Sequence, residues 1–443
     1  MSDISVPWGA SELRFDLPDL WELIQTADTA LKPASPDWPQ HMAMALNQPD
    51  TGLPLSSLLA ARRGGKIVLI LEDVTRHSPL EQILPIVLKE IRHAGIEDSQ
   101  LEVVFAAGMH PAMTPEQARE KLGPLADTIA WRSNPWTDKR AHTLLGKAQG
   151  IDVAIDKGVA AADLRIVISS VSPHLQAGFG GGYKMLLPGC ASIETIRGMH
   201  RLGLEKELTQ LVGTDSERNG LRQFIDEGGQ LLDASGGKTF SVQYLLDGND
   251  LPTAIGTGEP LPAQRMLAKQ AAVSCGVIVP ASCDVLITNA APRDFDMWQS
   301  FKGIANTLWA ARPGGVVICL TRCEAGLNGI KPIKWPLSQE GTRRILKLIG
   351  PHNLAKLVMR LVPRLAGDAA FFIRMATGML HRNPLFMVSP HLAATKVKFP
   401  GIRIFATPAD ALAAATELLG EGRQRVILFP NGGVTYPVPK LRE

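Results

Sequence analysis

The chain has 443 residues, which is enough for two or three domains with a large buried core. Hydrophobic residues make up 45% of it and charged residues 20%, as in an ordinary globular protein. The formal net charge is only +3 and basic residues form no dense run, which argues against a nucleic-acid-binding protein.

No segment has the features of a secretory signal or a membrane span. The N-terminal residues lack a basic region followed by an apolar one, and no apolar run reaches the roughly 18–20 residues that cross a bilayer. Among the five cysteines, Cys319 and Cys323 come nearest to a zinc-ligand pair, but no second pair follows them. We therefore expect a cytoplasmic protein with reduced, structural thiols and no contact with membranes.

Strand-like and helix-like segments alternate in the first half of the chain. Residues 66–72 (KIVLILE) are an apolar run typical of a parallel strand covered on both faces. A helix at about 79–93 and strands at 101–107 and 164–170 follow, and Thr114 begins a capping box before another helix. This alternation predicts a doubly wound, mostly parallel α/β sheet.

A second alternating series begins with a predicted strand at 283–289. Its other elements are a helix near 297–312, strands at 315–320 and 385–389, a helix at 408–419 and a strand at 425–429. The intervening segment, about 204–272, is more polar and glycine-rich, which predicts short helices and a hinge. We therefore expect two α/β lobes, residues 1–272 and 273–443, each with a mostly parallel sheet flanked by helices, and an active site in the cleft between them.

Polar side chains follow three predicted strands of the first lobe, where parallel strands present their carboxyl ends and ligands collect. Asp73 and Arg76 follow the first strand, His110 the second and His174 the third. Two imidazoles facing one cleft could serve as an acid/base pair near neutral pH, and a nearby guanidinium could hold a carboxylate. A single loop histidine is more often structural or solvated than catalytic, and only the occurrence of two histidines with Asp73 and Arg76 at one edge makes the two interpretations equal.

A glycine-rich loop precedes Lys184, and its last three glycines are Gly180, Gly181 and Gly182. Such glycines let backbone N–H groups approach an anion closely. The loop matches neither a dinucleotide fingerprint, which requires glycine at Tyr183, nor a P-loop, which requires Ser or Thr after the lysine. A mobile loop without a ligand is the alternative.

Four further positions complete the set of candidates. Apolar residues 185–187 could desolvate the Lys184 amine and make it nucleophilic. His200 lies on a predicted helix, where a core or surface position is the ordinary interpretation. Gln299 and Lys302 are three residues apart and share one face of a helix that follows a strand, a pattern that a solvated face also produces.

Taken together, these segments resemble the nickel-dependent lactate racemase family. The most specific match is residues 178–200, where the glycine loop, the lysine, Leu-Pro-Gly, Glu-Thr-Ile and a terminal histidine recur in order. Shorter motifs that match are residues 6–18, 73–76, 108–111, 172–174 and 299–302, together with the ending from 406 to 433. The resemblance thus covers nearly the whole chain.

The resemblance implies a racemase or epimerase of a 2-hydroxy acid that carries a nickel pincer nucleotide. This cofactor is a pyridinium mononucleotide whose two sulfurs and one ring carbon hold nickel. Lys184 would be its covalent attachment point and His200 the protein ligand to nickel. Enzymes of cofactor synthesis would then be partners for loading.

The resemblance also assigns the acid/base and substrate-binding groups. Because the C–H bond of a carbinol is not acidic, the family transfers hydride to the cofactor while a histidine takes the hydroxyl proton. His110 and His174 would be these two acid/bases. Substrate binding would fall to Arg76 and Lys302, with Asp73 and Gln299 in support.

The sequence departs from the family in its second lobe and leaves two other functions open. A tryptophan segment expected there is not evident, and its weak counterpart is residues 368–371. Loss of a bulky aromatic would admit a 2-hydroxy acid larger than lactate. An NAD-dependent 2-hydroxy-acid dehydrogenase is disfavoured because no Gly-x-Gly-x-x-Gly follows a strand. A non-catalytic cofactor- or ligand-binding protein would need neither histidine for proton transfer.

Overall fold

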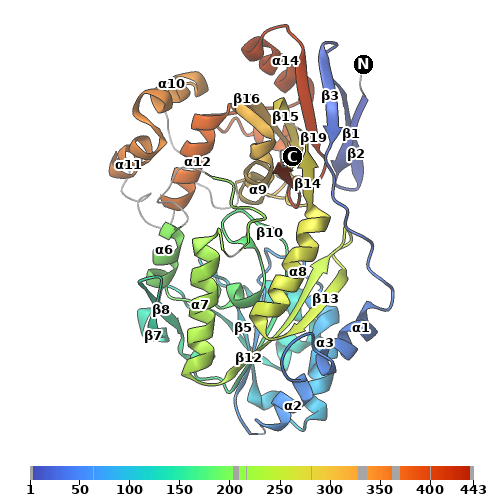
Figure 1. Ribbon diagram of the computed structural model, residues 1–443, viewed down its shortest axis with the longest axis vertical. Helices are drawn as coiled ribbons and strands as arrows, with labels where there is room; N and C mark the ends of the chain where they lie inside the picture. Colours follow the sequence, from blue (N-terminus) through green and yellow to red (C-terminus); the bar gives the residue numbers. More distant parts are fainter. Residues whose placement is uncertain are drawn as a thin grey trace.

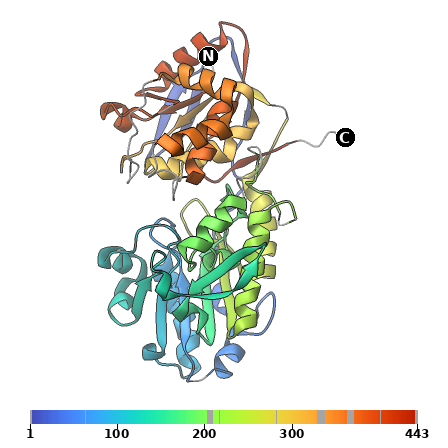
Figure 2. The same cartoon turned by 90° about the vertical axis from the view of Figure 1, so that its left-hand side faces the viewer.

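The computed structural model describes residues 3–62, 64–202, 209–215, 217–280, 282–327, 337–361, 370–399 and 401–439. Within these ranges, two six-stranded sheets lie toward opposite ends of the molecule, and helices flank each of them (Figures 1 and 2). We call the sheet that contains β4, with its helices, the first lobe, and the sheet that contains β15, with its helices, the second lobe. This architecture confirms the α/β prediction.

The first sheet is parallel except at one edge. Its strands in spatial order are β13 (Pro252–Gly258), β12 (Lys238–Leu246), β9 (Leu164–Ser170), β4 (Ile67–Leu71), β5 (Leu101–Phe105) and β6 (Ala130–Ser133). Only β12 and β13 pair in antiparallel fashion. Because β4, β5 and β9 are parallel neighbours, their carboxyl ends meet at one edge of the sheet.

Helices cover both faces of this sheet, which explains the continuous apolar runs of its strands. They are α1 (Trp38–Asn47), α2 (Leu55–Ala60), α3 (Leu80–His93), α4 (Pro115–Leu122), α5 (Lys157–Ala160), α6 (Ile193–Leu202), α7 (Gly220–Ser235) and α8 (Pro260–Cys275). Alternate residues of β4 enter two hydrophobic clusters, Leu69 with α1 and α3, and Ile70 with α6 and α7. A hairpin of β7 (His142–Ala148) and β8 (Ile151–Asp156) packs beside α6 and α7.

The second sheet is parallel throughout. Its strands in spatial order are β18 (Ile402–Phe405), β17 (Leu385–Val388), β16 (Ala311–Leu320), β15 (Cys283–Asn289), β19 (Gln424–Phe429) and β3 (Trp21–Thr26). Its helices are α9 (Met297–Thr307), α10 (Gln339–Ile349), α11 (Pro351–Leu361), α12 (Ala370–Arg382), α13 (Pro390–Ala394) and α14 (Pro408–Leu419). None of the helices in the described ranges combines the length and apolar character that a membrane span requires.

The N-terminal strands differ from the expected division of the chain. β1 (Asp3–Trp8) and β2 (Ser11–Asp16) form a hairpin beside the second sheet, and β3 pairs with β19 (Figure 1). The assignment of residues 1–272 to the first lobe therefore does not hold for these strands. No helix follows them closely, so the local pattern gives no sign of which sheet they join.

The middle of the chain is also more regular than expected. Instead of short helices and a hinge, residues 220–275 form two 16-residue helices, α7 and α8, around the β12–β13 pair. The buried apolar residues of α7 follow helical spacing; they are Leu221, Phe224, Ile225 and Leu232. Because polar residues lie between them, the average composition of this segment does not indicate a long helix. After α8, β14 (Gly276–Val279) pairs with β20 (Tyr436–Pro439).

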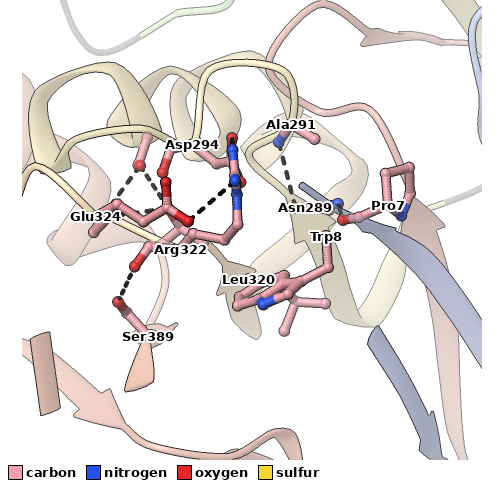
Figure 3. Close-up of polar contacts among 12 residues, drawn as sticks. Pro7, Trp8, Asn289, Ala291, Asp294, Leu320, Arg322, Glu324 and Ser389 are labelled. Atoms are coloured by element: carbon pink, nitrogen blue, oxygen red, sulfur yellow. Dashed lines mark hydrogen bonds and ion pairs between the residues drawn. The ribbon is translucent and has the colours of Figure 1, made fainter. Parts of the chain in front are cut away.

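Hydrogen bonds fix the loop at 290–296 that joins β15 to α9 (Figure 3). At the end of β15, the Asn289 side chain donates to the Pro7 carbonyl at 2.7 Å and so ties the N-terminal hairpin to this loop. The Arg322 guanidinium donates to both carboxylate oxygens of Asp294, at 2.6 and 3.1 Å. The start of α9 is therefore held in a defined position at the carboxyl edge of the second sheet.

Candidate active site

One cavity of about 1070 Å³ is lined by residues of both lobes and gathers nearly all the predicted site residues. Those in its lining are Asp73, Arg76, His110, His174, Gly180, Gly181, Lys184, His200, Gln299 and Lys302. Gly182, the remaining candidate, lies outside the lining, next to Gly181. The structure therefore brings the candidates together, although it does not by itself assign their roles.

His110 and Asp73 form a hydrogen-bonded pair at the edge of the first sheet. Nδ1 of His110 lies 2.5 Å from Oδ2 of Asp73, and the Thr75 backbone N–H donates to the other carboxylate oxygen at 3.0 Å. Burial raises the pKa of Asp73, but the hydrogen bond and charge of His110 outweigh it and hold that pKa well below its usual value. An ionised carboxylate can only accept, so Nδ1 of His110 carries the hydrogen and Nε2 is left for proton transfer.

His174 is held in the opposite tautomer. Its Nδ1 accepts hydrogen bonds from the backbone N–H groups of Gln176 and Ala177, at 3.2 and 3.1 Å. Burial lowers the pKa of His174 well below its usual value, and the charge of Lys184 adds to this effect. The ring is therefore neutral with its hydrogen on Nε2. His110 can accept a proton at Nε2, whereas His174 can donate a hydrogen bond from Nε2.

The cavity is lined by more basic than acidic side chains. The four basic ones are those of Arg76, Lys184, Arg293 and Lys302. The two carboxylates in the lining are already engaged: Asp73 by His110, and Glu72 by the backbone N–H and hydroxyl of Ser170, at 3.0 and 2.8 Å. Burial lowers the pKa of Lys302 well below its usual value, followed by repulsion from Arg76. A site of this kind attracts anions.

The glycine loop owes its composition to close packing. A Cβ atom at Gly181 would lie 2.6 Å from Val171 Cγ2 and 2.7 Å from Gln243 Oε1, and its φ of 75° already disfavours other residues. The Gly182 N–H donates to Gln243 Oε1 at 2.7 Å, and the Gly180 N–H donates to the Ser172 carbonyl at 2.8 Å. Two of the three N–H groups that we expected to face an anion are therefore bonded within the protein, and these glycines serve the packing of the turn.

Lys184 and His200 have environments that keep them uncharged. Burial lowers the pKa of Lys184 to about 7, with further lowering by Arg76 and Arg222. Burial, then Lys184, lowers the pKa of His200 to about 4. At neutral pH, roughly half of Lys184 is a free amine able to act as a nucleophile, and His200 is a neutral imidazole able to bind a metal.

The described residues contain no group of three or more His, Cys, Asp or Glu side chains that could hold a metal ion. Cys319 and Cys323, considered above as a zinc pair, are free and buried.

Two charged groups near the site, Lys121 and Arg293, were not predicted from the sequence. Lys121 donates to the backbone carbonyls of Arg76 and Ser78 and so fixes the loop that carries Arg76. Arg293 lines the cavity, and its buried Nη1 has no hydrogen-bond partner in the described part of the chain. Arg293 lies four residues beyond the end of β15. Because ligands collect at the carboxyl ends of parallel strands, its position could have identified it in the same way as that of His110.

Comparison with known proteins finds lactate racemases among the relatives of this chain. Residues 8–210 match the model of the lactate racemase N-terminal domain. A lactate racemase from Thermoanaerobacterium thermosaccharolyticum is 27% identical over 361 residues, which cover 76% of this chain and 78% of that protein. The lactate racemase of Lactiplantibacillus plantarum is 27% identical over 281 residues, 61% of this chain and 63% of that protein. The chain is thus similar to lactate racemases over most of its length.

The fold of the chain is also similar to those of solved structures. The lactate racemase apoprotein from Thermoanaerobacterium thermosaccharolyticum superimposes with a TM-score of 0.80 at 22% identity, covering 99% of this chain and 100% of that one. A protein from Thermotoga maritima superimposes with a TM-score of 0.61 at 16% identity, covering 91% and 98%. At these identities, the likenesses concern the fold alone.

Proposed function

We propose that this chain is a member of the lactate racemase family and an isomerase that racemises or epimerises a 2-hydroxy acid. One observation carries the proposal: His110 and His174 line the same cavity, and their hydrogen bonds favour opposite tautomers. Basic side chains line this cavity as well. The two named relatives are lactate racemases, and the same type of reaction is the natural extension to this chain.

The cationic groups would bind the substrate carboxylate. Arg76 and Lys302 both line the cavity, and Lys302 donates a hydrogen bond to Gln299, which holds its ammonium group in place. Charge-assisted hydrogen bonds to a carboxylate are stronger than neutral ones and fix its orientation. Arg293 has a donor to spare and is a third group available to the carboxylate.

The residues around Lys184 fit a nickel pincer nucleotide. The free-amine fraction of Lys184 suits covalent attachment, and the neutral imidazole of His200 suits a single protein ligand to nickel. When bound, this group supplies the acceptor and donor of hydride. Loading would require the enzymes of cofactor synthesis.

The histidines would move the hydroxyl proton. In the tautomers described above, Nε2 of His110 takes the proton, and Asp73 stabilises the resulting imidazolium. His174 donates a hydrogen bond from Nε2 to the substrate oxygen as the planar 2-keto acid forms. When the opposite enantiomer forms, the His110 imidazolium returns the proton from Nε2, and His174 keeps its donor role because its Nδ1 is occupied by two backbone N–H groups. Both lobes line the cavity, so they exclude water from the keto acid.

We also propose a substrate larger than lactate. Residues 368–371, from which the sequence predicted a wider pocket, have side chains outside the described residues. Support for a larger substrate comes from the described residues of the second lobe that line the cavity.

The alternatives are weaker on structural grounds. The glycine loop leads into a short turn, Gly182–Met185, and no long helix begins there to receive a dinucleotide pyrophosphate. A non-catalytic binding protein would not need the His110–Asp73 pair.

Co-expression with cofactor-synthesis enzymes tests the proposal. Intact mass and metal analysis should show a nucleotide-sized adduct with nickel, and chiral chromatography should show interconversion of 2-hydroxy-acid enantiomers without reduction of NAD. Reduction of NAD during turnover, or no interconversion by the loaded protein, would overturn the proposal.

A further inference from the structure

The cavity has a second end of different chemistry, between α10, α11 and α12. We call this end the apolar chamber and define it by six lining residues, Leu346, Leu354, Val358, Met375, Ala376 and Leu380. Among the described residues of these three helices, no charged side chain lines the cavity. Leu346, Leu354 and Leu380 are at most 4% exposed, whereas Leu361, which also lines this end of the cavity, is 69% exposed, so the chamber extends from the interior of the lobe to its surface.

The few hydroxyl groups in this region are directed to the protein backbone. Thr342 donates to the Ser338 carbonyl at 2.9 Å, and Thr377 donates to the Ile373 carbonyl at 2.8 Å. Both residues line the cavity, as do the neighbouring Leu346, Met375 and Leu380. A hollow with walls of this kind offers little to water and favours a hydrocarbon ligand.

Helix α9 connects the chamber to the charged end of the cavity. Its residues Lys302 and Phe301 both line the cavity. Phe301 packs against the same hydrophobic cluster as Leu346, Leu354 and Met375. A molecule whose carboxylate is bound by Lys302 therefore has a continuous apolar path past Phe301 into the chamber.

We propose that the apolar chamber binds the tail of the substrate, which is a 2-hydroxy acid with a long unbranched alkyl chain. This inference rests on the proposed function, because the head of the same molecule occupies the charged end. The cofactor proposed at Lys184 would fill part of the charged end of this cavity of about 1070 Å³, and the methyl group of lactate would leave the chamber without an occupant.

A chain-length series on the cofactor-loaded enzyme is the first test. Racemisation of lactate, 2-hydroxyhexanoate, 2-hydroxyoctanoate and malate is compared by kcat/KM. Each added methylene should raise kcat/KM about two- to fourfold until the chamber is full, and malate should be poor because its second carboxylate would enter apolar surroundings. Equal values along the series, or a maximum at lactate, would overturn the chamber assignment.

A filling variant and a matched control locate the effect. Ala376→Phe places a ring in the chamber and should lower the ratio of kcat/KM for 2-hydroxyoctanoate to kcat/KM for lactate at least tenfold. Ala393→Phe is the control, because Ala393 is also partly buried in the second lobe but does not line the cavity. If Ala376→Phe does not fold, Val358→Phe on α11 makes the same test. Equal sensitivity of the two substrates to filling would contradict the proposal.

A binding measurement separates this inference from the proposed function. Calorimetry of the unloaded protein with octanoate and with acetate should show tighter binding of octanoate and a more negative heat-capacity change. Octanoate binding without racemisation of any 2-hydroxy acid by the loaded enzyme would overturn the proposed function but retain the chamber. Racemisation of lactate without octanoate binding would overturn the chamber and retain the function.

Discussion

The two ends of the cavity are built in different ways. At the first-lobe end, each candidate catalytic group follows a strand and is held by hydrogen bonds, as with His110 on Asp73 and His174 on two backbone N–H groups. At the second-lobe end, α10, α11 and α12 supply an apolar wall, in which the hydroxyls of Thr342 and Thr377 donate to backbone carbonyls. Chemistry is thus fixed by a rigid sheet edge, while the size of the ligand is set by helix packing.

This difference separates two kinds of change in the sequence. A substitution at the sheet edge removes a group whose orientation depends on named hydrogen bonds, so a small displacement there costs rate. A substitution among the three helices changes the volume and shape of an apolar wall and leaves the reacting groups where they are. The predictions below test this separation.

The largest expected effect is at Lys184. Lys184→Ala should abolish both the covalent adduct and racemisation and leave the fold intact, because no second attachment group replaces the amine. Intact mass, turnover and circular dichroism check this. Lys147→Ala is the control, since Lys147 is exposed and does not line the cavity. Full activity of Lys184→Ala would remove the basis for a lysine-tethered cofactor.

The ionisation of Lys184 gives the next largest effect. Because its folded pKa is lowered to about 7, the free-amine fraction at pH 7 exceeds that of an ordinary lysine by roughly a thousandfold. Carbamylation of the unloaded protein by cyanate should therefore rise with pH through a midpoint near 7 at Lys184, as peptide mapping would measure. Lys147 serves as the internal reference, and a shared midpoint for the two lysines would contradict the prediction.

Loss of either imidazole should cost about a hundredfold or more in kcat. His110→Ala removes the proton acceptor and His174→Ala removes the opposing donor. Asp73→Asn should cost less, because it only loosens the orientation of His110 and its stabilisation as an imidazolium. His93→Ala, on the exposed end of α3, is the control. Activity within tenfold of the parent enzyme in both histidine variants would exclude them as acid/bases.

Arg293 should have a smaller effect, confined mainly to binding. Arg293→Gln removes a charge-assisted donor and should raise KM for the 2-hydroxy acid about tenfold or more, with kcat changed less. Arg312→Gln is the control, because Arg312 pairs with Asp284 and does not line the cavity. An unchanged KM would show that Arg293 does not contact the substrate.

The smallest expected effects concern two hydroxyl groups, that of Ser170 at the first-lobe end of the cavity and that of Thr377 at the second-lobe end. Ser170→Ala leaves buried Glu72 without one of its donors and should lower the free energy of unfolding by roughly 1–3 kcal/mol. Thr377→Val removes a hydroxyl that bonds only to its own helix, and should cost under about 1 kcal/mol. Denaturant unfolding measures both. A larger loss at Thr377 than at Ser170 would reverse the comparison.

The sequence predicted the strand edges well because their signals are local. Apolar runs marked β4, β5 and β9, and the parallel arrangement then placed His110 and His174 near one another. The packing role of the glycine loop could not be predicted, because Gln243, which accepts from the Gly182 N–H, lies 61 residues away. The apolar chamber was equally invisible, since leucines at helical spacing have the same pattern whether they face a filled core or a hollow.

The pairing of β3 with β19 has a consequence for synthesis of the chain on the ribosome. Trp21 pairs with Gln424, so about 400 residues must be translated between the two strands. At roughly 5–20 residues per second, β3 waits on the order of 20–80 s for its partner. All strands of the first sheet have been translated well before then. β3 is therefore among the last strands to be paired, and during that interval its edge is open to association with other nascent chains.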